Sequence, residues 1–206
     1  MQCKYLTIER EYGSGGTKIA ELLAEECSLP CYGRKILEIV AQNRNITVDQ
    51  IEEYEESVTG SFLYTIFMMS TIRSGQSNKL SEKEQVYVEE QEVIHQLAED
   101  GPAIFLGHCA SNALHDKKGV VKVFIRAPKE QKLSTIREEY GIEENLVEST
   151  RKYFDRKRAN YYHTNTGKEW KNVDNYDIVL DSSTLGIKGC VDVLKGLFLC
   201  NYSVPS

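Results

Sequence analysis

The chain has 206 residues, of which 41% are apolar and 27% charged, a composition typical of a globular protein with one sizeable core. Its formal net charge of −6 argues against nonspecific binding to nucleic acid or acidic membrane surfaces, but not against a small anionic ligand. The six cysteines form no C-x-x-C pair, which argues against a zinc site and indicates reduced thiols. The most apolar run, residues 62–69, falls short of the ~20 residues of a membrane span, and no signal-like segment is present, so we expect a cytoplasmic protein.

Four short apolar runs predict β-strands at residues 5–8, 103–108, 120–127 and 176–181. Apolar residues at helical spacing predict helices between them, at residues 19–27, 86–97 and 187–197. Strands that alternate with helices over such long intervals favour a parallel sheet joined by crossover helices. The sequence therefore predicts a single α/β domain.

Two polar regions interrupt this alternation. Residues 43–84 indicate a helical insertion on one side of the sheet. Residues 145–172 indicate a long polar helix followed by a mobile loop, TNTGKEWKNVDN. The core then consists of residues 1–42, 85–144 and 173–206.

The segment IEREYGSGGTKIAEL, which begins at Ile8, has the layout of a phosphate-binding loop: a strand, a glycine-rich turn and a helix. Gly15 and Thr17 match the signature G-x-x-x-x-G-K-[ST], and Thr17 takes the position that ligates Mg²⁺. Arg10 stands where the first glycine belongs, and Gly16 stands where the lysine belongs. Lys18 comes one residue late, about 100° around the helix. Either Lys18 or Arg10 could supply the missing charge, or the loop is a turn without a ligand.

Residues 151–171 carry seven basic and two acidic side chains, a local charge of +5 in an acidic chain. Arg151, Asp155, Arg158 and Tyr162 share one helical face, so Asp155 could hold both arginines toward an anion. The segment is either a solvated helix with ion pairs or a lid that closes over a site.

The aromatic side chains of this segment allow two interpretations. Trp170, Tyr161 and Tyr162 could pack against a nucleotide base, or they could anchor the lid to the core. We expect at least one of the two tyrosines to lie in the core.

Five segments together resemble the cytidylate-kinase-like family of P-loop proteins: IEREYGSGGTKIAELLAEECSLPCYGRKILE, PAIFLGHCASNAL, VFIRAP, DRKRANYYHTNTGKEW and NYDIVLDSS. The resemblance implies a three-layer P-loop NTPase-type fold, with a five-stranded parallel sheet, helices on both faces, a helical acceptor-binding insertion and a lid. It implies ATP as phosphoryl donor, with Mg²⁺, and a nucleoside monophosphate as acceptor. The family's loop has the same REYGSGG form, so the missing lysine is a family trait.

The resemblance also assigns roles by position. The donor phosphates would lie against Gly13, Ser14, Gly15, Gly16, Thr17 and Lys18, with Thr17 near the metal. The catalytic cations would be Arg156, Arg158 and Lys18, and the acceptor would meet Tyr32, Arg34 and His108. Two positions depart from the family pattern: Gly33 stands where aspartate is usual, and His108 where arginine is usual.

The leading hypothesis is ATP-dependent phosphoryl transfer to a nucleoside monophosphate, such as CMP or dCMP, or to a similar small phosphoacceptor. An alternative is a catalytically silent sensor that binds a nucleotide or phosphate. A third hypothesis is an interaction protein that uses the acidic residues 49–56 as its contact surface. We expect a small nucleotide as partner, no nucleic acid or membrane, and a monomer or homodimer.

Overall fold

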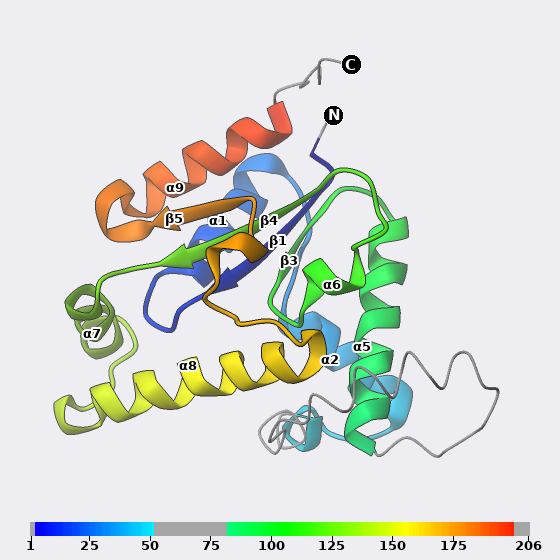
Figure 1. Cartoon of the computed structure of the whole chain (residues 1–206), viewed down its shortest axis with the longest axis horizontal. Helices are drawn as coiled ribbons and strands as arrows, with labels where there is room; N and C mark the ends of the chain where they lie inside the picture. The colour runs from blue at the N-terminus through cyan, green and yellow to red at the C-terminus, as the bar shows by residue number, and fades with distance from the viewer. Residues whose placement is uncertain (1–2, 52–81, 200–206) are drawn as a thin grey trace.

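A five-stranded parallel sheet forms the centre of the protein. The computed structural model describes residues 3–51 and 82–199 of the chain. Its strands are β1 (Tyr5–Arg10), β2 (Cys31–Tyr32), β3 (Ala103–Leu106), β4 (Val120–Arg126) and β5 (Ile178–Asp181) (Figure 1). They lie in the order β2-β3-β1-β4-β5, and every pair is parallel. Strand β1 is therefore central, and the residues that follow it emerge in the middle of the carboxyl edge.

Helices cover both faces of the sheet. They are α1 (Gly16–Cys27), α2 (Arg34–Arg44), α5 (Glu82–Glu99), α6 (Ala110–Ala113), α7 (Lys129–Glu138), α8 (Glu144–Thr166) and α9 (Ser182–Leu199), with a short 3-10 turn, η1 (Val173–Asn175). Ile104 and Leu106 of β3 pack with α1 and α9 on one face, whereas Ala103 and Phe105 pack with α2 and α5 on the other. This alternation explains the continuous apolar run in the sequence, because both faces of the strand are buried. The predicted three-layer α/β fold is confirmed.

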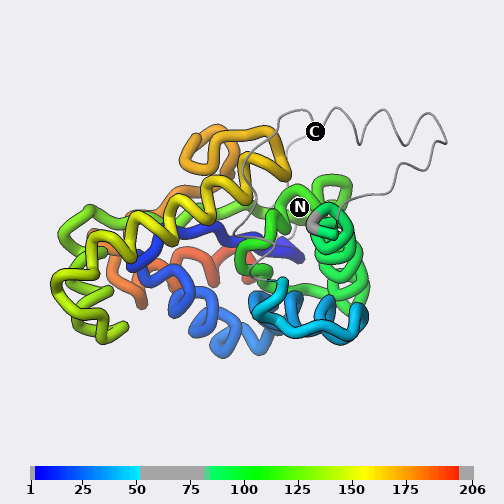
Figure 2. Tube along the Cα trace, turned by 90° about the horizontal axis from the view of Figure 1, so that it is seen from below, coloured from blue at the N-terminus to red at the C-terminus, as the bar shows by residue number. Residues whose placement is uncertain are grey.

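Helix α8 lies at the carboxyl edge of the sheet, beside the loop that follows β1. In Figure 2 it appears in yellow on the opposite side of the central strands from helix α1. The backbone N–H of Tyr12, two residues after β1, donates to Asp155 in the middle of α8. The long polar helix predicted from the sequence is thus present, and it covers the region where the glycine-rich loop begins.

The structure corrects several predicted boundaries. Strand β2 was not predicted from the apolar pattern, because it has only two residues and depends on pairing with Ile104 and Phe105. Strand β3 ends at Leu106, and His108 lies beyond it with a φ of +54°.

The cysteines that the structure describes are free thiols, as expected.

The two predicted excursions have different outcomes. Most of the insertion at residues 43–84, including the apolar run at 62–69, lies outside the described residues. The prediction of a mobile loop after α8 is wrong. Trp170 is only 2% exposed, and the Tyr176 hydroxyl donates to the Trp170 carbonyl at 2.6 Å. This segment is packed against the sheet.

Candidate functional site

The glycine-rich loop between β1 and α1 has a backbone that only glycine adopts easily at two positions. Gly13 and Gly15 have φ of +81° and +74°. A Cβ on Gly13 would lie 2.7 Å from the Lys132 carbonyl oxygen, so the loop is also closely packed. Ser14 fastens the turn, because its hydroxyl donates to the Glu11 carbonyl at 2.7 Å and its own carbonyl accepts from Ser182 at 2.7 Å. Its hydroxyl is thus used within the protein, so its predicted contact with the donor phosphates would have to come from its backbone.

Helix α1 begins at this loop with no side-chain cap at its N-cap residue, Gly15. The first backbone N–H groups of a helix have no intrahelical partner, and the helix dipole adds partial positive charge there. Such a helix start favours an anion. It opens on a cavity of about 560 Å³, which we call the loop cavity; its walls include Arg10, Gly13, Gly15, Gly16, Thr17, Lys18, Glu139, Tyr140 and Arg158.

A second cavity of about 250 Å³, here the inner cavity, lies under helix α8. It is lined by Glu9, Arg10, Gly107, His108, Phe154, Lys157, Arg158, Tyr161 and Tyr162. Arg10 and Arg158 line both cavities, so the two spaces meet at a pair of guanidinium groups. This is the arrangement that a transferred anionic group between two ligands would require.

Arg158 is held in this position from two sides. Its Nη1 donates to the Arg10 carbonyl at 2.9 Å, and its guanidinium lies 5.6 Å from the centre of the Tyr12 ring. Burial lowers the pKa of Arg158, against the opposing effect of the Glu9 and Asp155 carboxylates. Arg156, the second arginine predicted for the lid, is exposed and lines neither cavity. The structure brings Arg158 to the site and leaves Arg156 at the surface.

Glu9 is a buried carboxylate in the wall of the inner cavity. Its Oε2 accepts from the Trp170 indole N–H at 3.0 Å. Burial raises its pKa, although Arg10, the indole N–H and Arg158 act in the opposite direction. Trp170 therefore anchors the segment after α8 to the sheet, and Tyr162 is buried in the same aromatic cluster, as expected for at least one tyrosine.

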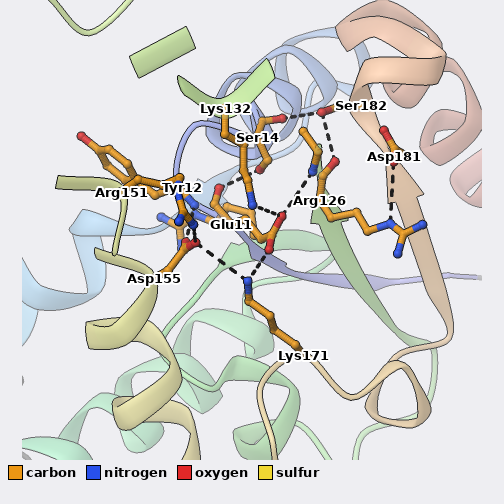
Figure 3. A network of polar contacts seen from close by, with 12 residues as sticks. Glu11, Tyr12, Ser14, Arg126, Lys132, Arg151, Asp155, Lys171, Asp181 and Ser182 are labelled. Atoms are coloured by element: carbon orange, nitrogen blue, oxygen red, sulfur yellow. Dashed lines mark hydrogen bonds and ion pairs between the residues drawn. The ribbon is translucent and has the colours of Figure 1, made fainter. Parts of the chain in front are cut away.

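A network of ion pairs ties helix α8 to the residues after β1 (Figure 3). Asp155 accepts from the Tyr12 N–H at 2.8 Å and from Arg151 Nη1 at 3.2 Å. Glu11 accepts from Lys132 at 2.7 Å and from Lys171. Although burial opposes ionisation, these two hydrogen bonds keep the pKa of Glu11 below its usual range.

This network bears on the predicted role of Asp155. The Arg151–Asp155 pair is confirmed. Arg158, however, donates to a backbone carbonyl rather than to Asp155. Lys171 contributes instead, with its Nζ 3.9 Å from Asp155. Helix α8 is thus fixed to the loop by Arg151, Asp155 and Lys171, none of which lines either cavity, and by Glu11, which lines the loop cavity.

Of the three residues predicted to contact the acceptor, one lines the inner cavity and two do not. His108 lines the inner cavity, and its Nδ1 lies 3.4 Å from Oε2 of the fully buried Glu90. Tyr32 lies in β2 with its ring 5.5 Å from that of Phe105, and the exposed Arg34 begins α2. Neither of these two lines the loop cavity or the inner cavity.

The predicted loop residues Thr17 and Lys18 both line the loop cavity. Lys18 is exposed, and its Nζ lies 3.7 Å from a Glu139 carboxylate that is exposed as well. Gly16 has no room for a side chain, because a Cβ there would lie 2.5 Å from the Arg10 Cβ. In the part of the chain that the structure describes, no group of three or more His, Cys, Asp or Glu residues could hold a metal ion. None of the helices in residues 3–51 and 82–199 is long and apolar enough to cross a membrane.

Comparison with solved structures supports the fold. An uncharacterized protein from Eubacterium ventriosum matches 97% of this chain and 100% of its own, with a TM-score of 0.71 and 20% identity. Shikimate kinase from Bacteroides thetaiotaomicron matches 95% of this chain and 98% of its own, with a TM-score of 0.53 and 11% identity. Both identities are low, so these likenesses concern the fold alone. No curated protein matches the sequence.

The model of the cytidylate kinase-like family matches residues 5–184. This range includes the glycine-rich loop, both cavities and the whole of helix α8. The chain therefore belongs to the cytidylate kinase-like family.

Proposed function

We propose that the protein is a kinase that transfers the γ-phosphoryl group of ATP, with Mg²⁺, to a nucleoside monophosphate such as CMP or dCMP, or to a similar small phosphoacceptor. Family membership supports kinase-like activity in general. The observation that carries the specific proposal is the pair of cavities that meet at Arg10 and Arg158. In a phosphoryl transfer, charge develops between donor and acceptor, and cations fixed at that point stabilise the transition state.

The loop cavity fits a donor triphosphate. The positive φ of Gly13 and Gly15 shapes the loop that precedes α1, and the uncapped start of α1 directs N–H groups toward an anion. Tyr140 lies in the wall of the loop cavity and offers aromatic surface for the base of the donor. Mg²⁺ neutralises phosphate charge when it is bound, and Thr17 is the side chain that would hold it, together with phosphate oxygens. Lys18, at the exposed rim, would add attraction at longer range.

The inner cavity fits a small anionic acceptor. Arg10, Lys157 and Arg158 carry positive charge and outnumber the acidic Glu9 among the described residues of the wall. Phe154 and Tyr161 offer aromatic surface for a base. His108, two residues after the end of β3, lies in the same wall and would contact the acceptor. Tyr32 and Arg34 stay predictions for the acceptor, because they lie outside both cavities.

Catalysis in this arrangement depends on positioning and charge rather than on covalent chemistry. The hydrogen bond from Arg158 to the Arg10 carbonyl fixes one guanidinium at the junction before any ligand binds. The hydrogen bond from Tyr12 to Asp155 keeps helix α8 beside the loop, where it would limit the access of water to the transferred group.

The proposal is tested first by ligand binding and then by turnover. A thermal-shift series with ATP, ADP, CMP, dCMP and sulfate, with and without Mg²⁺, should show stabilisation by ATP; a ligand at ~100 Kd adds about 2.7 kcal/mol. A coupled assay of ADP release should then identify monophosphates that accelerate it. ATP binding without turnover on any acceptor would support the silent sensor, and no response to any phosphate compound would exclude both functions.

Two variants on helix α8 test the role of the junction. Arg158→Ala should lower kcat about 100-fold or more, because it removes a cation that is fixed before the reaction. Arg156→Ala should have a clearly smaller effect, because its side chain is exposed and outside both cavities. Equal losses in the two variants would contradict the assignment of Arg158 to the junction.

A further inference from the structure

The side chain of Arg10 lies in a slot made by two glycines. A Cβ on Gly16 would lie 2.5 Å from the Arg10 Cβ and 2.9 Å from its Cγ. At the other end, a Cβ on Gly107 would lie 2.8 Å from Arg10 Nη1. Real Cβ atoms do not approach other heavy atoms so closely, so the stem of Arg10 requires the glycine at position 16, and its guanidinium would have to shift if Gly107 carried a side chain.

The guanidinium of Arg10 has no partner among the residues that the structure describes. It makes no hydrogen bond and no ion pair within residues 3–51 and 82–199, and its Nε–H is buried without an acceptor. A buried donor of this kind is costly, because it has lost its hydrogen bonds to water. An arginine that serves only the fold would have a carboxylate or carbonyl here. The Nε–H group without an acceptor is instead suited to an anionic ligand.

The surroundings of Arg10 also disfavour the charged form of its side chain. Burial and the positive charge of the neighbouring Arg158 together lower the pKa of Arg10 to about 9, although the Glu9 carboxylate acts in the opposite direction. Arg10 still carries its charge at neutral pH, but both effects disfavour that charge in the free protein. An anion between Arg10 and Arg158 relieves both, since it supplies an opposite charge and new hydrogen bonds.

Arg10 and Gly16 occupy the two positions where this loop departs from the P-loop signature. A lysine at position 16 would begin where the stem of Arg10 now lies, so the two cations exclude one another in space. We propose that Arg10, from the end of strand β1, takes the place of the P-loop lysine and binds the phosphates of the donor in the proposed reaction. This inference rests on the proposed function, because it assigns a residue to the donor site of that reaction.

The exchange has a chemical consequence. Lysine presents a point charge on a flexible stem, whereas arginine presents a planar fork that can bind two phosphate oxygens at once. Arg10 lines the loop cavity and the inner cavity, so its fork faces both the donor and the acceptor side. The glycine at position 16 is then required to make room for Arg10, and the absence of the lysine does not remove the positive charge from the site.

The test exchanges the two positions. Arg10→Gly combined with Gly16→Lys turns residues 10–17 into GEYGSGKT, which satisfies the complete P-loop signature. Titration of MgATP by calorimetry should show that R10G and R10A bind about 10- to 100-fold more weakly than the wild type, as expected for the loss of a charged hydrogen bond. The swap R10G/G16K should regain most of that affinity. G16K alone should bind weakly and unfold at a lower temperature, because both cations compete for one slot.

Arg126 provides the matched control. It ends strand β4 as Arg10 ends β1, but its side chain is exposed, with its Nε 3.8 Å from Asp181. R126G and R126A should bind MgATP with wild-type affinity. If the swap variant does not fold, the comparison of R10A with R126A decides the question.

The outcomes separate the two proposals. A wild-type protein that does not bind MgATP overturns the proposed function and this inference together. A wild-type protein that binds MgATP, with an equally tight R10A variant, overturns the inference alone. A folded swap variant that binds no better than R10G also contradicts it.

Discussion

Trp170 is the residue at which two interpretations of the lid can be separated most sharply by substitution. In the structure its ring packs against Phe124, with 5.3 Å between the ring centres, and its indole N–H donates to Glu9. A tryptophan in this position anchors the segment after α8 to the sheet and is not available to stack on a nucleotide base. We therefore predict that its substitution primarily affects the free energy of unfolding.

The structure gives the size of this effect. Trp170→Ala removes an almost fully buried ring and should cost about 3–5 kcal/mol, as large-to-small substitutions in cores do. In a chain of this length each kcal/mol lowers the melting temperature by roughly 2–4 °C. Trp170→Phe keeps most of the ring but leaves the buried Glu9 oxygen without its donor, so it should cost about 1–3 kcal/mol.

The assay is urea unfolding, together with MgATP titration of each variant. Trp170 is the only tryptophan of the chain, so its fluorescence reports on this cluster directly in the wild type, while circular dichroism follows the variants. In the wild type the fluorescence should resist quenching by acrylamide and change little when MgATP binds. The reasoning is refuted if Trp170→Ala unfolds at the wild-type urea concentration and loses affinity for the nucleotide.

Three further predictions concern the loop and the inner cavity. Gly13→Ala should cost at least about 1 kcal/mol more than Gly141→Ala, measured by urea unfolding, because both have positive φ but only Gly13 would press a Cβ against a backbone oxygen; equal costs would contradict the close packing of the loop. The raised pKa of Glu9 means that its burial favours the protonated form, so its contribution to stability is greatest at low pH and falls as the pH rises above the unfolded value. Glu9→Gln should accordingly gain stability relative to the wild type as the pH rises above about 4.5, and a difference in urea unfolding that stays constant with pH would contradict this. Lys18→Ala should weaken MgATP binding only about 2- to 5-fold in calorimetry, because the charge is exposed to solvent, and a loss as large as that of Arg10→Ala would assign the P-loop charge to Lys18 instead.

The strands and the glycine-rich loop could be predicted because their signals are local. Continuous apolar runs mark β3 and β5, and glycines after a strand and before an amphipathic helix mark the loop. Strand β2 could not be predicted in this way, since two residues show no period and only their pairing with β3 makes them a strand. The segment after α8 is polar in sequence, and only the structure shows that Trp170 holds it to the sheet.

The charges of the site were harder to predict because their partners are far apart in the sequence. Glu11 binds Lys132 and Lys171, which lie 121 and 160 residues away. The spacing of Arg151 and Asp155 within one helix did predict their ion pair. The relation between Arg10 and Gly16 was visible only as two separate departures from a motif. The lack of room for a side chain at position 16 beside the stem of Arg10 depends on how the end of β1 meets the start of α1.

The central claim is that the donor phosphates bind to the backbone of the glycine-rich loop beside Arg10. The most direct test is an NMR titration of the ¹⁵N-labelled protein with MgATP. The account predicts that the largest shifts occur at the amides of Gly15, Gly16 and Thr17 and at the Nε–H of Arg10, which gains an acceptor. Binding of MgATP with these four signals unchanged would contradict it.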